Sequence, residues 1–216
     1  RIIAVHLSGE IDGTITAVTI GGVAAAAKVQ ARDTGSAPDQ VSEIWATPKS
    51  VDGGPTGASG NIVVSVSSGT PVVAASTFRI VGASSTVSDT DTNQGSAATI
   101  ALTALVVPGG GAAIVGFCNN TDTTAVAWTN ASEAFDTDAG VHRDSSAITH
   151  AGGTITITAD GATANQALSG VAWAPTATLV ARGGAEGLAA GNGGLGGIAA
   201  NGTGATKFTG GNGGTS

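Results

Sequence analysis

Short runs of β-branched residues, separated by turn signals, are the feature that most constrains the fold of this chain. The clearest run alternates Thr and Ile from Thr154 to Thr158 and is followed by the turn pair Asp160-Gly161. A period of two places both Ile side chains on one face and the Thr side chains on the other, as in a half-buried strand. Eight further runs predict strands, at residues 14–20, 41–46, 61–66, 77–81, 99–107, 112–118, 125–129 and 167–173.

Turn signals stand between these runs, for example Asp12-Gly13 and Pro108-Gly109-Gly110. They supply the positive backbone dihedrals and the fixed proline angle that tight turns need. Many short strands with such punctuation predict an all-β fold, an antiparallel Ig-like or jelly-roll-like β-sandwich over residues 1–176. A short N-terminal strand, residues 2–7, is expected to pair separately.

Helical signals are weak and short. Residues 23–28 are rich in Ala and fit a single helical turn, but the preceding Gly21-Gly22 fits a hairpin equally well. Residues 131–135 are compatible with another single turn, with Asn130 as its N-cap. Neither segment changes the all-β prediction.

Glycine falls on a three-residue grid near the end of the chain. Of the eleven positions reached in steps of three from Gly184 to Gly214, seven are Gly and three are Ala. Three residues per turn is the repeat of a polyproline-II helix, and small residues at each turn let such helices pack closely. After Pro175 the sequence therefore predicts a second region, residues 177–216. It is either an extended, glycine-lined element stabilised by homotypic packing or a flexible tail.

Composition argues against two classes of function. The chain has 216 residues, a formal net charge of −7 and eight Lys and Arg that are scattered singly, so no basic patch is available to neutralise nucleic-acid phosphates. No apolar stretch reaches the roughly eighteen residues that a membrane-spanning helix needs.

The one cysteine, Cys118, cannot form an intramolecular disulfide and is expected to pack as a small hydrophobe. The chain contains no Met, so Arg1 is interpreted as a processed or trimmed beginning.

The acidic run at residues 89–93, Asp-Thr-Asp-Thr-Asn, begins like a calcium-binding loop. An EF-hand loop would continue with Gly at its sixth position and Glu at its twelfth, where this chain has Gln94 and Ile100. A solvated polar turn is therefore expected. A looser calcium loop, here or at Asp136-Thr137-Asp138, is the alternative.

His142, Asp144 and Ser145 stand close together in sequence and have the residue types of a hydrolytic triad. Triads assemble from separated segments, and the chain has no Gly-x-Ser-x-Gly elbow to hold a strained serine. We expect His142 to be an exposed loop residue without a catalytic role. His6 and His150 are isolated, and no pair of His has metal-binding spacing. No catalytic, cofactor-binding or metal-binding residue is assigned.

Three other patterns have simpler explanations than a site. The Gly-x-Gly-x-x-Gly pattern at residues 191–196 lacks the following helix and acid of a dinucleotide site, so it reflects composition. Asn119, Asn130 and Asn201 match the glycosylation acceptor, which matters only in a eukaryotic secretory route. The large aromatic residues are expected to build the core, which leaves few for stacking on sugars. They are Trp45, Phe78, Phe117, Trp128, Phe135 and Trp173.

Residues 41–45, 60–66 and 78–83 resemble segments of Ig-like sandwich proteins from tailed bacteriophage virions. The glycine-rich segment is similar to those of phage fibres and adhesins. This resemblance implies a non-enzymatic structural protein on the virion exterior, either a fibre or spike component or a capsid decoration, without a cofactor. It also implies other virion proteins as partners, a homo-oligomer with a trimer favoured, and a host surface receptor or glycan as a further partner. The alternatives are a bacterial surface adhesin or carbohydrate-binding module and, third, a hydrolase.

Overall fold

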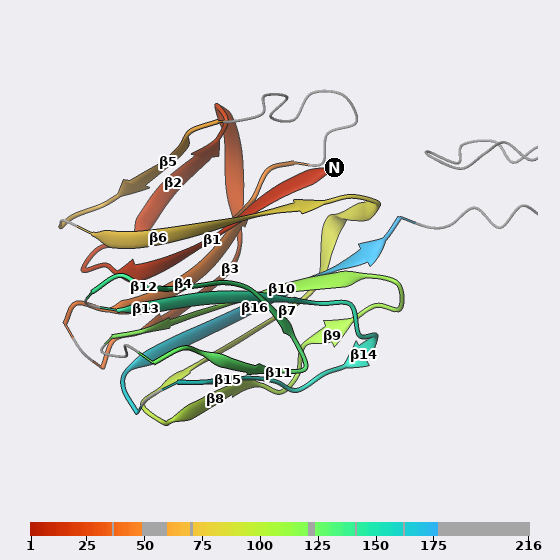
Figure 1. Cartoon of the computed structure of the whole chain (residues 1–216). Helices are drawn as coiled ribbons and strands as arrows, with labels where there is room; N and C mark the ends of the chain where they lie inside the picture. The colour runs from red at the N-terminus through yellow and green to blue at the C-terminus, as the bar shows by residue number, and fades with distance from the viewer. Residues whose placement is uncertain are drawn as a thin grey trace, which may run out of the picture. The chain divides into compact units, whose positions relative to one another are not determined.

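The computed structural model describes residues 1–35, 37–48, 60–69, 71–120, 124–140, 142–161 and 163–176. Arg1–Pro175 form one compact unit. Its described residues build β-strands and no helix (Figure 1), and every strand pair is antiparallel, so the prediction of an all-β sandwich is confirmed. The predicted glycine-rich segment, residues 177–216, lies outside the described residues.

The first large sheet has six strands in the order β5-β2-β3-β4-β1-β6. β1 lies between β4 and β6, so the expectation that the N-terminal strand pairs separately is wrong. The segment at residues 23–28 belongs to a hairpin between β2 and β3, and Gly21 and Gly22 take the positive φ angles of its turn. The strands are β1 (Ile2–Glu10), β2 (Ile15–Ile20), β3 (Val23–Asp33), β4 (Gln40–Ala46), β5 (Ile62–Val66) and β6 (Val72–Ile80).

The second large sheet has five strands in the order β12-β13-β10-β16-β7. They are β7 (Ala83–Gly95), β10 (Ala112–Asn119), β12 (Ser132–Asp138), β13 (Arg143–Thr149) and β16 (Gln166–Pro175). A three-stranded sheet, β11-β15-β8, and a two-stranded sheet, β14-β9, complete the described fold. Their strands are β8 (Thr99–Leu102), β9 (Val106–Val107), β11 (Ala127–Thr129), β14 (Gly153–Thr154) and β15 (Ile157–Asp160).

Three clusters of buried apolar side chains form the core. Side chains from the two faces of β1 contribute to two of these clusters. Ile2 and Ala4 pack between the two large sheets, whereas Val5 and Leu7 point to the other face, inside the curl of the first sheet. The third cluster, around Phe117, joins the second sheet to the three-stranded sheet. Five of the six aromatic residues contribute to these clusters as expected, with Trp173 and Phe117 among the largest fully buried side chains. The exception is Phe135 in β12, which is half-buried and belongs to none of the three clusters.

Several local predictions are corrected. Residues 131–135 belong mainly to strand β12, whose pairing with β13 outweighs a weak helical preference, and Asn130 takes a φ of 63° before it. Residues 99–107 divide into β8 and β9. The alternating run at residues 154–158 divides into β14 and β15, because Ile155 N–H bonds to Leu105 O between them. Strands β7 and β13 were not predicted.

Candidate functional site

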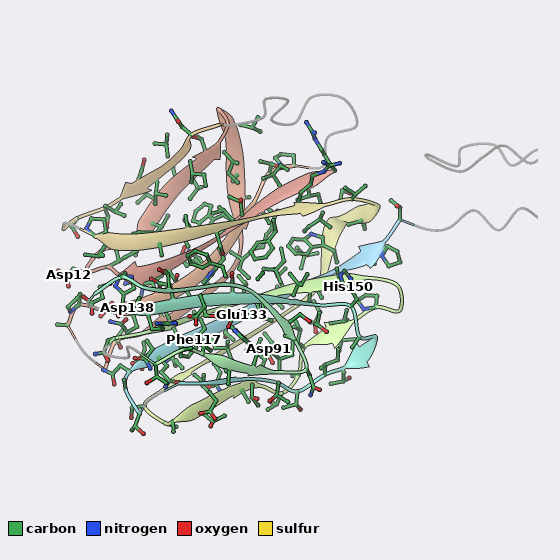
Figure 2. All side chains as sticks on the ribbon, viewed as in Figure 1. Asp12, Asp91, Phe117, Glu133, Asp138 and His150 are labelled. Carbon is green, nitrogen blue, oxygen red and sulfur yellow. The ribbon has the colours of Figure 1, made fainter. Side chains whose placement is uncertain are left out.

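The layer between the two large sheets changes from apolar to polar along the strands. On β1, Ile2 and Ala4 are followed on the same face by His6 and Ser8, and all four are buried. Figure 2 shows side chains filling the space between the sheets. We call the polar part the polar layer. Its buried members are His6, Ser8, Gln40, Ser42, Ser76, Cys118, His142, Asp144, Ser146 and Ser169.

The centre of the polar layer is the ring of His6, which lies against Gly116 of β10. A Cβ atom at position 116 would lie 2.1 Å from Cδ2 of His6. Gly116 is paired with Ser146 of β13 on one side and with Ser169 of β16 on the other. The absence of a side chain at position 116 therefore makes the space that the imidazole occupies.

Two serine pairs join the sheets beside this ring. The hydroxyls of Ser42 and Ser169 lie 2.8 Å apart, and so do those of Ser76 and Ser146. Nε2 of His6 lies 3.0 Å from the Ser42 hydroxyl. Buried polar groups are tolerated when they are hydrogen-bonded, and directional contacts of this kind specify one alignment of the two sheets.

Burial lowers the pKa of His6 to about 4, although the nearby charge of Asp144 acts in the opposite direction. The imidazole is therefore neutral near pH 7. In that state one ring nitrogen accepts a hydrogen bond and the other donates one. A neutral ring suits a site where its neighbours are hydroxyl groups.

Cys118 is buried as expected, but its surroundings are polar. Its thiol donates a hydrogen bond to Oε1 of Gln40 at 3.3 Å. Nε2 of the same amide donates to Pro38 O at 3.3 Å and to Oε1 of Glu10 at 3.4 Å. Burial, assisted by the charge of Asp144, raises the pKa of the Cys118 thiol well above its usual value. The thiol is therefore protonated at neutral pH.

The expectation that His142 is an exposed loop residue is wrong. Only 1% of its surface is exposed, and its Nε2 lies 2.7 Å from Oδ2 of Asp144. Ser145 points to the opposite face of β13, since successive strand residues alternate. There its hydroxyl accepts from Nε1 of Trp128 and donates to Phe135 O, each at 2.9 Å. The three residues therefore do not converge on a triad.

The acidic pairs lie in strands and not in turns. The carboxylate of Asp89 in β7 accepts the backbone N–H of Val106 at 2.6 Å, and that of Asp91 accepts the N–H of Ala104 at 2.9 Å. Asp136 in β12 accepts a hydrogen bond from Nε of Arg143 at 2.7 Å. Within the described ranges, no group of three or more His, Cys, Asp or Glu is arranged to hold a metal ion.

An open groove lies around His150, the residue that follows β13. Two hollows share Ile148 and His150 in their linings. One, of about 190 Å³, is mainly apolar and includes Phe78 and Ile114. The other, of about 450 Å³, includes polar Asn130, Ser132 and Thr149. His150 is labelled in Figure 2, at the end of the sandwich opposite to Asp12 and Asp138. We call this region the His150 groove.

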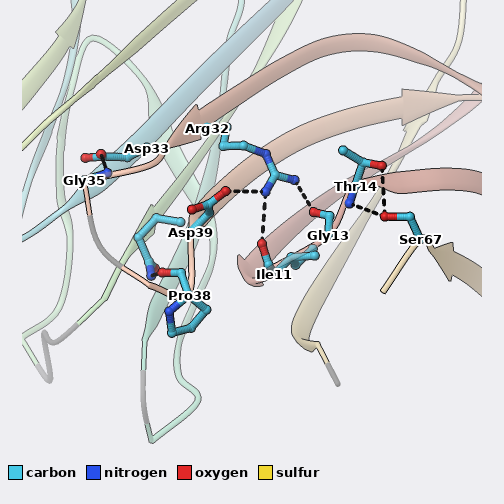
Figure 3. A network of polar contacts seen from close by, with 10 residues as sticks. Ile11, Gly13, Thr14, Arg32, Asp33, Gly35, Pro38, Asp39 and Ser67 are labelled. Atoms are coloured by element: carbon cyan, nitrogen blue, oxygen red, sulfur yellow. Dashed lines mark hydrogen bonds and ion pairs between the residues drawn. The ribbon is translucent and has the colours of Figure 1, made fainter. Parts of the chain in front are cut away.

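A cluster at the surface anchors the turn between β1 and β2 (Figure 3). The guanidinium of Arg32 in β3 donates to Ile11 O at 3.0 Å and to Gly13 O at 2.7 Å. It also pairs with Asp39 at 2.9 Å. One side chain therefore fixes two carbonyls of the turn against the neighbouring strands.

The asparagines of two glycosylation motifs, Asn119 and Asn130, are among the described residues, and they differ in exposure. Asn119 is completely buried, which closes it to modification in the folded chain. Asn130 is exposed, and its Nδ2 donates to Thr156 O at 2.8 Å. Asn201 lies outside the described residues.

Comparisons with protein-family models, curated proteins and solved structures found no match for this chain. Over the described ranges, no helix has the length and apolar character to cross a membrane.

Proposed function

We propose that this chain is a non-enzymatic structural protein on the exterior of a bacteriophage virion, either a fibre or spike component or a capsid decoration. The observation that carries the proposal is the polar layer. Residue types that elsewhere perform acid-base and nucleophilic chemistry, such as His6, Ser42 and Asp144, are buried between the sheets. In that position His6 and Ser42 join the two sheets, and all three side chains are shielded from a substrate in solution.

The sheet contacts support a role in which shape matters more than chemistry. The serine pairs and the His6 ring fix one alignment of two large sheets, and three apolar clusters fill the remaining layers. Such a block keeps its form when many copies must fit one assembly. The glycine grid from Gly184 to Gly214 in the sequence supports self-association, with a trimer as the favoured state. Other virion proteins and a host receptor or glycan are the proposed partners.

The proposal is tested on particles from a culture that carries the gene. Virions are purified on a density gradient, and the chain is quantified by mass spectrometry against the other proteins in the same fraction. We expect a fixed copy number per particle, and immunogold labelling then distinguishes a tail from a capsid location. Recovery of the chain only as free protein, in fractions without particles, contradicts the proposal.

The His150 groove favours a second candidate, an adhesin or carbohydrate-binding module. The larger hollow presents the amide of Asn130, the hydroxyls of Ser132 and Thr149, and the imidazole of His150. Such groups can hydrogen-bond sugar hydroxyls. A glycan array with the full chain tests this candidate. Binding that is lost in His150→Ala and kept in Asp12→Ala, an exposed position at the opposite end of the sandwich, together with absence from particles, would favour it over the virion role.

A further inference from the structure

We propose that Cys118 and Gln40 form an internal thioester that cross-links the two large sheets, with release of ammonia. Both side chains are buried, and they come from β10 and β4, which belong to different sheets. The Cys118 sulfur lies 3.3 Å from Oε1 of Gln40. That oxygen is one carbonyl bond, about 1.2 Å, from the carbon that the sulfur attacks. The contact places a nucleophile beside an amide carbonyl in a site shielded from water.

The amide of Gln40 is held at both ends. Its oxygen accepts from the thiol of Cys118, while its nitrogen donates to Pro38 O and to Oε1 of Glu10. The leaving nitrogen is therefore oriented away from the sulfur before any reaction begins. Because folding already holds the two reacting groups in fixed positions, the reaction does not have to lose the entropy of bringing them together. A rotation about the Cγ–Cδ bond of Gln40 is the movement that the attack requires.

A carboxylate stands beside the nucleophile. Asp144 of β13 is the cross-strand partner of Cys118, and both are buried. Oδ2 of Asp144 lies 2.7 Å from Nε2 of His142, and the Asp144 side chain also interacts with the thiol of Cys118. A protonated thiol needs a base before it can attack. Asp144 is placed to serve as that base.

Formation of the thioester needs only groups that this chain supplies. Asp144 takes the proton of the thiol as Sγ of Cys118 bonds to Cδ of Gln40. The Cδ–Nε2 bond then breaks, the proton passes to Nε2, and ammonia leaves. One C–S bond replaces one C–N bond, no group is oxidised or reduced, and no second reactant is needed. A chain with one cysteine thereby gains a covalent link between its sheets.

Intact mass and thiol content of the purified full chain, both measured in guanidinium, test the proposal. We expect a mass about 17 Da below that of the sequence, equal to the loss of ammonia, and no thiol that reacts with iodoacetamide. Hydroxylamine should then release one reactive thiol. The Gln40→Glu variant should show its full sequence mass and one free thiol. An unshifted mass with one free thiol in the unaltered protein overturns the proposal, even if no variant folds.

Controls separate the cross-link from two other modifications. Succinimide formation at an Asn-Gly pair such as Asn201-Gly202 also removes ammonia. In that case the unaltered protein keeps its thiol and Cys118→Ala keeps the mass loss, which counts against the cross-link. A disulfide-linked dimer shows twice the chain mass and also counts against it. Asp144→Asn, with folding verified by circular dichroism, should lower the cross-linked fraction; an unchanged fraction overturns the role of Asp144 as base.

Discussion

The hydroxyls of Ser42 and Ser169, which are 127 residues apart in sequence, meet at 2.8 Å and join the two large sheets. The same Ser42 hydroxyl contacts the ring of His6. This hydroxyl therefore links a strand pair within the first sheet to a strand of the second.

Replacing Ser42 should weaken the fold more than replacing Ser76. Ser42→Ala leaves both His6 and Ser169 without a partner, whereas Ser76→Ala leaves only Ser146 without one. A buried polar group that loses its partner costs about 1–3 kcal/mol, so we expect Ser42→Ala to lose about 2 kcal/mol or more and Ser76→Ala less. Urea denaturation measures both. Equal losses would show that the contact with His6 adds nothing.

A methyl group at position 116 should be poorly tolerated. Gly116→Ala places Cβ 2.1 Å from Cδ2 of His6, and that ring is buried between the sheets. Overpacking of this kind costs about 1–3 kcal/mol. Gly109→Ala is the matched control, because a Cβ there meets no atom within 4 Å. Thermal unfolding should separate the two variants clearly, and similar melting temperatures would disprove the crowding.

Stability should fall on acidification because of His6. Its pKa is about 4 in the folded chain, below the ordinary value of 6.5, so the unfolded chain binds more protons between these limits. The free energy of unfolding contributed by this group is fully present above pH 6.5. About 3 kcal/mol of it is lost as the pH falls to 4.

The variant His6→Gln isolates this contribution. Urea denaturation at several pH values from 4 to 7 should show a steeper loss of stability in the unaltered protein than in the variant. Carboxyl groups titrate in both proteins and cancel in the comparison. Parallel curves for the two proteins would mean that the pKa of the ring is the same in the folded and the unfolded chain.

Arg32 should contribute more stability than an exposed arginine. Arg32→Met removes donors from Ile11 O and Gly13 O and also leaves Asp39 without its ion pair. We expect a loss of about 1–2 kcal/mol in urea denaturation. Arg79→Met is the control, since Arg79 is exposed and should change stability by less than about 0.5 kcal/mol. An equally small effect at Arg32 would contradict the anchoring role.

Strands with an apolar face could be predicted from the sequence. Residues 41–46 and 112–118 correspond closely to β4 and β10, because their β-branched side chains fill apolar clusters on at least one face. The Gly, Pro and Asp residues between these runs likewise indicate the turns that separate the strands. These signals are local, and they suffice for the fold class.

Strand β13 could not be predicted, for a reason that lies in the polar layer. Its residues that face the first sheet include Asp144 and Ser146, so the usual apolar alternation is missing. The same polarity led to the incorrect expectation that His142 is exposed. Only the pairing of β13 with β10 and β12 reveals that these residues are interior. The contact between Cys118 and Gln40 likewise depends on two sheets meeting, and no local pattern indicates it.

The positions of the first and last strands of the unit also determine how it bears mechanical force. β1 and β16 are interior strands, each flanked by a neighbour on both sides. Tension applied to the chain beyond Pro175 acts along β16, so its hydrogen bonds to β10 and β7 are sheared together and do not open one at a time. A unit anchored through its last strand in this way resists being pulled apart.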